Sequence, residues 1–104
     1  MKLSTHFVGR KVKSALRVQG YLQIYFCDAS ILNVFNRVRT PQISEDFLAQ
    51  LTEKIITNEI IDSDTLALEF SGGIRLEIGL ADADFQGPEA LAVTEPDGRI
   101  TIWP

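Results

Sequence analysis

The sequence contains little of the chemistry on which many enzymes depend. Its 104 residues include one cysteine, Cys27, and one histidine, His6. A single cysteine excludes an intrachain disulfide and a metal site built on several thiolates, and it is compatible with a reducing compartment. A nucleophilic pair would need both side chains within hydrogen-bond distance, and nothing in the spacing of these two residues brings them together. The sequence therefore indicates no catalytic residue, no metal and no cofactor, and it favours a protein that is not an enzyme.

The sequence also contains fewer positively than negatively charged residues. Ten lysines and arginines stand against fourteen aspartates and glutamates, which gives a net charge of −4. Nucleic acids and anionic membranes require a basic surface, so neither is an expected partner. No apolar run approaches the ~18 residues of a membrane span, and Met1 and Lys2 lead into a mixed segment rather than into the apolar stretch of a signal peptide. We expect a cytoplasmic protein with one domain, residues 1–104.

What the sequence does contain is a clear β-hairpin at residues 65–80. Apolar and polar residues alternate on both sides of Gly72-Gly73. Alternation with a period of two on each side of a glycine pair is typical of two antiparallel strands with one apolar face. The apolar positions are Leu66, Leu68, Phe70, Leu76, Ile78 and Leu80.

A second copy of this pattern precedes the first. When the sequence is shifted by 44 residues, residues 7–34 fall on residues 51–78 and the apolar positions coincide. Two copies are too few for a solenoid, which needs about three stacked units, so a doubled unit inside one domain is expected. We predict strands at 11–18, 21–27 and 31–35 in the first unit, a strand at 55–61 before the hairpin in the second, and a last hairpin at 89–94 and 99–103.

One helix is predicted between the units, at residues 45–53. Ser44 is a good N-cap, and Glu45 and Asp46 lie in the first turn, where the helix dipole favours acidic side chains. The fold class is therefore α+β and mostly β. We expect about eight antiparallel strands that form a curved sheet or a partly open barrel, with the helix packed on the sheet.

The two units differ on the face that should point away from the core. In the second unit this face carries small or charged residues such as Glu69, Arg75 and Glu77, as expected for a face in water. In the first unit it carries Tyr21, Gln23, Tyr25, Cys27, Ile31, Asn33 and Phe35, which is too apolar for a solvated face. Three covers are possible: the helix or last hairpin of the same chain, a second copy of the chain, or another protein or ligand. Tyr21, Tyr25, Ile31 and Phe35 are the candidate binding residues.

Two groups of acidic residues could in principle bind a cation, but each is better explained as a loop or as a solvated surface. Asp82, Asp84 and Gly87 resemble the start of a calcium loop, but Val93 occupies the position where an EF-hand has a bidentate glutamate. A polar connecting loop is the preferred interpretation. Glu69 and Glu77, with Arg75 nearby, are interpreted as a solvated charged face.

The doubled pattern L-x-L-x-F-x-x-G-x-x-L-x-I, followed by an E-A-x-x-V strand and a terminal tryptophan, resembles a group of small uncharacterised bacterial proteins. The residues that carry it are Leu66, Leu68, Phe70, Gly73, Leu76, Ile78, Glu89, Ala90, Val93 and Trp103. Leu91 stands where that group typically has an aromatic residue. The resemblance implies a compact β-rich fold in a bacterial protein, and it implies no activity.

Two functions are compatible with these features. The first is a non-enzymatic interaction or homo-oligomerising module, for example a homodimer or a small partner-binding protein of the immunity type, whose partner is protein rather than nucleic acid or membrane. The alternative is a small-molecule-binding protein or weak hydrolase with a pocket between the helix and the sheet.

Overall fold

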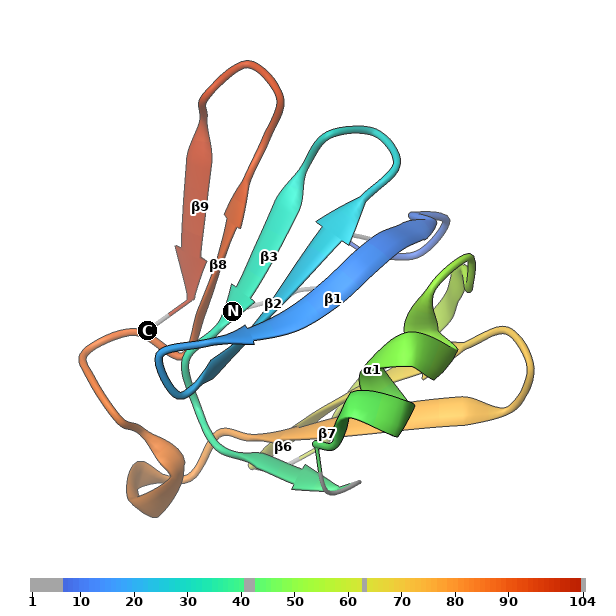
Figure 1. The fold of residues 1–104 in the computed structure, drawn as a ribbon. Helices are drawn as coiled ribbons and strands as arrows, with labels where there is room; N and C mark the ends of the chain where they lie inside the picture. The colour runs from blue at the N-terminus through green and yellow to red at the C-terminus, as the bar shows by residue number, and fades with distance from the viewer. Residues whose placement is uncertain (1–6, 41–42, 63, 104) are drawn as a thin grey trace.

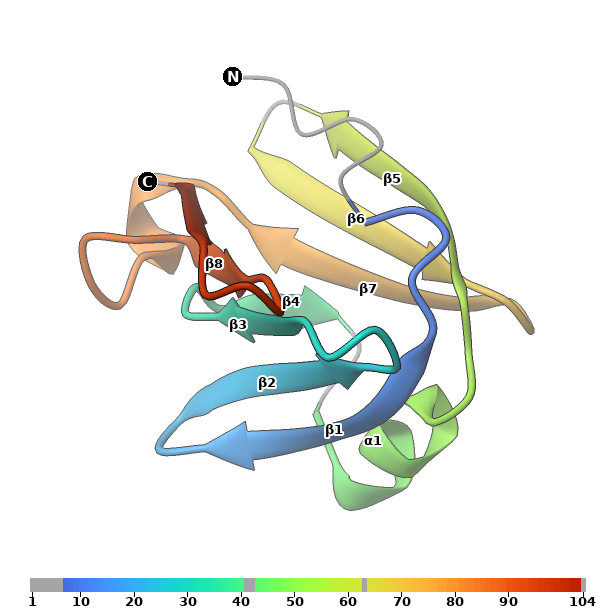
Figure 2. The ribbon, with the colours of Figure 1, turned by 90° about the horizontal axis from the view of Figure 1, so that it is seen from above.

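The computed structural model describes residues 7–40, 43–62 and 64–103, and the side chains of all of these except residues 40 and 103. In this part of the chain two antiparallel sheets surround a hydrophobic core (Figures 1 and 2). The predicted fold class, α+β and mostly β, is confirmed, and the sheets are not closed into a barrel.

The first sheet has the strand order β1-β2-β3-β8-β9. Its strands are β1 (Val12–Val18), β2 (Tyr21–Phe26), β3 (Ile31–Val34), β8 (Leu91–Thr94) and β9 (Ile100–Trp103). The second sheet has the order β4-β7-β6-β5. Its strands are β4 (Val38–Thr40), β7 (Ile74–Gly79), β6 (Thr65–Phe70) and β5 (Ile56–Asp62). Helix α1 (Glu45–Leu51) connects β4 to β5, two strands of the second sheet, and a short 3₁₀ helix, η1 (Asp82–Asp84), follows β7.

The pairing register repeats at the spacing of 44 residues. In β1 and β2, Val12 pairs with Phe26, and the register shifts between Val12 and Ser14. In β5 and β6, Ile56 pairs with Phe70, and the register shifts between Ile56 and Asn58. Each unit therefore has its bulge at the same point. The alternation of apolar and polar residues, which sets the strand register, gives the same register in both units.

Two features join the sheets in addition to the segment that runs from β7 to β8. Lys11 and Ile55 form an isolated bridge that connects the beginning of β1 to the beginning of β5. Elsewhere the chain passes from β3 into β4 through a corner in which the N–H groups of Phe35 and Asn36 both donate to the carbonyl oxygen of Ala90. The corner carries the chain from the first sheet to the second.

Alternate residues of the strands fill the core, as the hairpin pattern predicts. Ile24, Leu32, Leu68 and Leu76 have no exposed surface, and Phe47, Leu48 and Leu51 of α1 pack against the same cluster. The N–H of Phe47 donates to the Oγ of Ser44 over 3.2 Å, which confirms the predicted N-cap.

Three details differ from the sequence-based expectation. The helix ends at Leu51 rather than at residue 53, and Glu53 has a φ of 72°, a left-handed conformation that no helix continues. Strand β4 was not predicted, so the described residues contain nine strands rather than eight. The expected loop after β7 contains η1. In the described part of the chain, no helix is long and apolar enough to cross a membrane.

Candidate functional site

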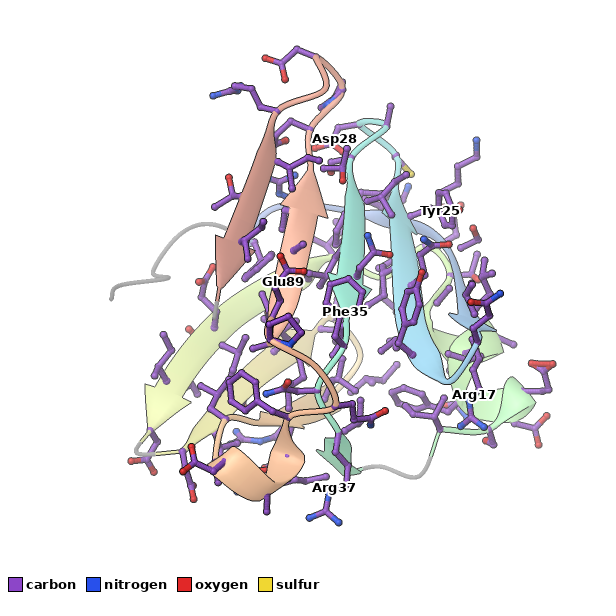
Figure 3. All side chains as sticks on the ribbon, turned by 90° about the vertical axis from the view of Figure 1, so that its left-hand side faces the viewer. Arg17, Tyr25, Asp28, Phe35, Arg37 and Glu89 are labelled. Carbon is purple, nitrogen blue, oxygen red and sulfur yellow. The ribbon has the colours of Figure 1, made fainter. Side chains whose placement is uncertain are left out.

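The predicted binding residues lie together on the outer face of the first sheet. Residues that pair directly across antiparallel strands point to the same side, so the register defines the rows of this face. One row consists of Leu16, Gln23, Asn33, Ala92 and Ile102, and the next consists of Ser14, Tyr25, Ile31, Thr94 and Ile100. Figure 3 views the molecule from this side, with Tyr25 and Phe35 in front of the ribbon.

An aromatic contact forms the third row. Val18 pairs with Tyr21, and the ring of Tyr21 lies 5.0 Å from the ring of Phe35, tilted by 55°. This distance and tilt fall in the favourable range for aromatic pairs. We call the thirteen residues of these three rows the outer face. Tyr21, Tyr25, Ile31 and Phe35 are all half-buried members of it.

The outer face contains no charged residue, although 23% of the chain is charged. Three of its polar side chains are already bonded to one another. The hydroxyl of Tyr25 donates to Oε1 of Gln23 over 2.7 Å, and Nε2 of Gln23 donates to Oδ1 of Asn33 over 2.7 Å. Because these groups have partners within the face, removing water from it costs less than it would for unpaired polar groups.

Of the three covers that the sequence left possible, the helix and the last hairpin of the same chain do not lie over this face in the described residues. Among the described residues, α1 directs Phe47, Leu48 and Leu51 into the core beside β1, so it lies on the inner side. The last hairpin joins the edge of β3 through β8 and extends the same sheet. It therefore enlarges the outer face instead of covering it.

The contribution of this hairpin to the outer face was not predicted from the sequence. Ile100 and Ile102 of β9 are 60% and 46% exposed, and they point to the same side as Tyr25 and Gln23. Their spacing of two residues was visible in the sequence, but their membership of the face depends on β8 pairing with β3. In contrast, Cys27 lies beyond the end of β2 and is exposed, rather than lying on the face as predicted. His6 lies outside the described residues.

The outer face of the second sheet has the opposite character. Arg75 lies between two carboxylates: its Nη1 is 2.7 Å from Oε2 of Glu69 and its Nε is 2.8 Å from Oε2 of Glu77. The hydrogen bonds from Arg75 to Glu77 and Glu69 raise the pKa of its guanidinium above the usual value. This network is the solvated charged face predicted for the second unit.

Asp84 is paired with two arginine side chains rather than arranged as a calcium ligand. Its carboxylate is 2% exposed and lies 3.2 Å from Nε of Arg37 and 2.6 Å from Nη2 of Arg39. The hydrogen bond from Arg39 lowers the pKa of Asp84 below its usual value. Among the residues that the structure describes, no three histidine, cysteine, aspartate or glutamate side chains form a group that could hold a metal ion.

Two open depressions are lined in part by Arg17, near the turn between β1 and β2. One of about 360 Å³ is lined by Tyr21, Asn36, Arg17 and Arg37 among others. Another of about 310 Å³ lies between α1 and Arg17. Both arginines already have partners, since Arg17 donates to the carbonyl oxygen of Ile43 over 2.8 Å and Arg37 is paired with Asp84. The depressions offer hydrogen-bond donors and one aromatic wall, and they assemble no nucleophile with a base.

Comparisons of the chain with protein-family models, with curated proteins and with solved structures gave no match. The resemblance to small bacterial β-rich proteins therefore stays a prediction.

Proposed function

We propose that the chain is a non-enzymatic interaction module that associates with protein, a copy of itself or another chain, through the outer face of its first sheet. The observation that carries this proposal is the absence of charge from all thirteen positions of the described face. Solvent-exposed sheet faces ordinarily carry charged side chains, and contiguous apolar patches on soluble proteins commonly mark interaction sites.

The composition of the face supports a protein partner. The centre of a protein interface is poor in charged residues and rich in aromatic ones. Tyr21, Tyr25 and Phe35 supply large rings with few rotatable bonds, and the Tyr25–Gln23–Asn33 hydrogen bonds hold the polar groups in place. A partner that covers the face would leave few unpaired polar groups behind.

The test is the association of the chain in solution. Light scattering over a concentration series should give a mass that rises above that of the 11.6 kDa monomer. Tyr25→Glu places a charge in the middle of the face, and burying it without a partner is costly. We expect this variant to weaken association at least about tenfold, the effect of a central interface residue.

Ile61→Glu is the matched control, because Ile61 is 44% exposed on the second sheet and lies away from the outer face. It should associate like the wild type. Association that is unchanged by Tyr25→Glu, with circular dichroism showing both variants folded, would contradict self-association through the outer face.

The alternative function, a small-molecule-binding protein or weak hydrolase, has weaker support. The depression beside Tyr21 has the size of a small-ligand site, but it is open and its arginines are engaged by Ile43 and Asp84. Nothing among the described residues places a general base beside a nucleophile there.

A further inference from the structure

The four edge strands of the two sheets differ in how they are protected. An unprotected edge presents unpaired N–H and C=O groups to other chains, and natural proteins block such edges with bulges, charges or short strands. Strand β1 has a bulge and Lys13, and β5 has a bulge and Glu59. Strand β4 has three residues, an irregular register and Arg39. Strand β9 has a continuous register with β8 and no charged residue from Ile100 to Trp103.

No described strand pairs with the outer edge of β9, and the backbone groups on this free side can be assigned. The N–H of Glu95 donates to the carbonyl oxygen of Arg99 over 2.8 Å at the hairpin turn. Hydrogen-bonded and non-hydrogen-bonded pairs alternate along an antiparallel ladder, so Thr101 exchanges its bonds with Val93. The N–H and C=O groups of Ile100 and Ile102 therefore point away from β8, toward the free edge.

These groups fit a second copy of the same strand. We propose that two copies of the chain pair antiparallel along β9, with Thr101 of each copy beside the two-fold axis. Ile100 of one copy then lies opposite Ile102 of the other, and each of these two pairs exchanges two backbone hydrogen bonds. The isoleucines meet as apolar cross-strand pairs on the outer face, and the two threonines meet on the opposite side, which are both favourable pairings.

Charge supports a second copy as the occupant. A two-fold interface brings each surface against itself, so a charged edge on a chain of net charge −4 would repel its copy. The stretch Ile100–Trp103 of β9 carries no charge and has no such cost. This inference rests on the proposed function, association with protein, and deepens it. Pairing along β9 would join two outer faces into a single uncharged surface across ten strands.

Cross-linking tests the register directly. In a Cys27→Ala background, which removes the exposed native thiol, Thr101→Cys places two thiols in a non-hydrogen-bonded pair with Cα atoms about 4.5 Å apart. That separation allows a disulfide. Ile100→Cys is the matched control on the same strand, because its two copies would lie about 9 Å apart, beyond the ~7 Å limit for a disulfide.

Mild oxidation should convert most of the Thr101→Cys chain to a disulfide-linked dimer, at least about tenfold more than the Ile100→Cys chain. Equal cross-linking of the two variants, or none in either, would overturn the proposal. As a second measurement without cysteine chemistry, Ile102→Lys should raise the dimer dissociation constant at least about tenfold, since it sets lysines at the paired edge. A dissociation constant unchanged by Ile102→Lys would also overturn it.

These experiments distinguish dimerisation along the β9 edge from association through the outer face. Tyr25 lies on β2, with β3 and β8 between it and β9. A dimer that is sensitive to Tyr25→Glu but does not cross-link at Thr101→Cys would support the outer face and exclude the β9 edge. A dimer that cross-links at Thr101→Cys and is insensitive to Tyr25→Glu would support the edge and contradict self-association through the face.

Discussion

The carboxylate of Asp84 occupies the space in which a Cβ atom on Gly79 would have to lie. A Cβ built on Gly79 overlaps the Cγ and both oxygens of Asp84, and Asp84 cannot easily withdraw because it is buried and held by Arg37 and Arg39. Gly79 also donates its N–H to the carbonyl oxygen of Arg37 over 2.9 Å and accepts a hydrogen bond from Nδ2 of Asn36 over 2.8 Å. The absence of a side chain at Gly79 lets the end of β7, the corner before β4 and η1 meet.

We predict that Gly79→Ala destabilises the fold by about 1–3 kcal/mol, the usual cost of overpacking a filled site. The free energy of unfolding, measured with urea, checks this prediction. Gly87→Ala is the control, because a Cβ on Gly87 meets no atom within 4 Å, and its effect should stay within about 0.5 kcal/mol. Equal stability of the two variants would show that Asp84 moves freely.

Asp84 should also make stability depend on pH. Arg39 lowers the pKa of Asp84, so the folded carboxyl takes up its proton at a lower pH than the unfolded one, whose ordinary value is 3.8. The carboxylate therefore stabilises the fold above about pH 4, and this stabilisation is lost as the pH falls toward the lowered pKa. Asp84→Asn should be less stable at pH 7 and should lose less stability than the wild type on acidification.

Urea unfolding between pH 2 and pH 7 measures this difference. Some acid sensitivity should remain in Asp84→Asn, since the pKa of Asp64 and that of Asp97 are also lowered, by hydrogen bonds from Arg39 and from the backbone and side chain of Arg99. Asp82→Asn, an exposed change in the same 3₁₀ helix, should follow the wild-type curve. An Asp84→Asn curve parallel to the wild-type curve would rule out the assigned role.

The N-cap of α1 gives a third prediction. Ser44→Ala removes the acceptor for the N–H of Phe47 and should cost about 1 kcal/mol of unfolding free energy. Ser44→Asp retains an acceptor and should remain close to the wild type. Thermal or urea unfolding of the three proteins would test the order, and a Ser44→Ala protein as stable as Ser44→Asp would refute it.

Equivalent core positions of the two units should respond alike. Ile24 and Leu68 are 44 residues apart in the sequence, have no exposed surface, and occupy the same place in their pairing registers. Replacement of either by alanine should cost about 2–5 kcal/mol. Ile61→Ala removes a comparable side chain that is 44% exposed and should cost no more than about 1 kcal/mol. Chemical denaturation compares the three, and a small effect at only one core position would contradict the equivalence.

Local sequence patterns predicted the strands in which apolar and polar residues alternate and the helix that begins with an N-cap. The hairpin of β6 and β7 was visible because apolar residues alternate on both sides of a glycine pair. Strand β4 was missed because its three residues carry no pattern of their own and exist as a strand only through pairing with β7. The role of Asp84 was missed for a similar reason, since its partner Arg39 lies 45 residues earlier in the chain.

The candidate face was predicted in composition but not in extent. The residues of β2 and β3 could be assigned to the face because the matching positions of the second unit carry small or charged residues. No local signal states that β8 pairs with β3, and this long-range pairing decides both that the face stays uncovered and that Ile100 and Ile102 extend it.

The corner between β3 and β4 also bears on how the protein folds. Because the chain passes directly from one sheet into the other there, and because Lys11 and Ile55 bridge the sheets, we expect the two sheets to unfold together. Many of these contacts join residues far apart in sequence, and such topologies fold on the slow scale of milliseconds to seconds. We therefore expect a single kinetic phase of unfolding, with the most protected amide protons of both sheets exchanging at the same global rate.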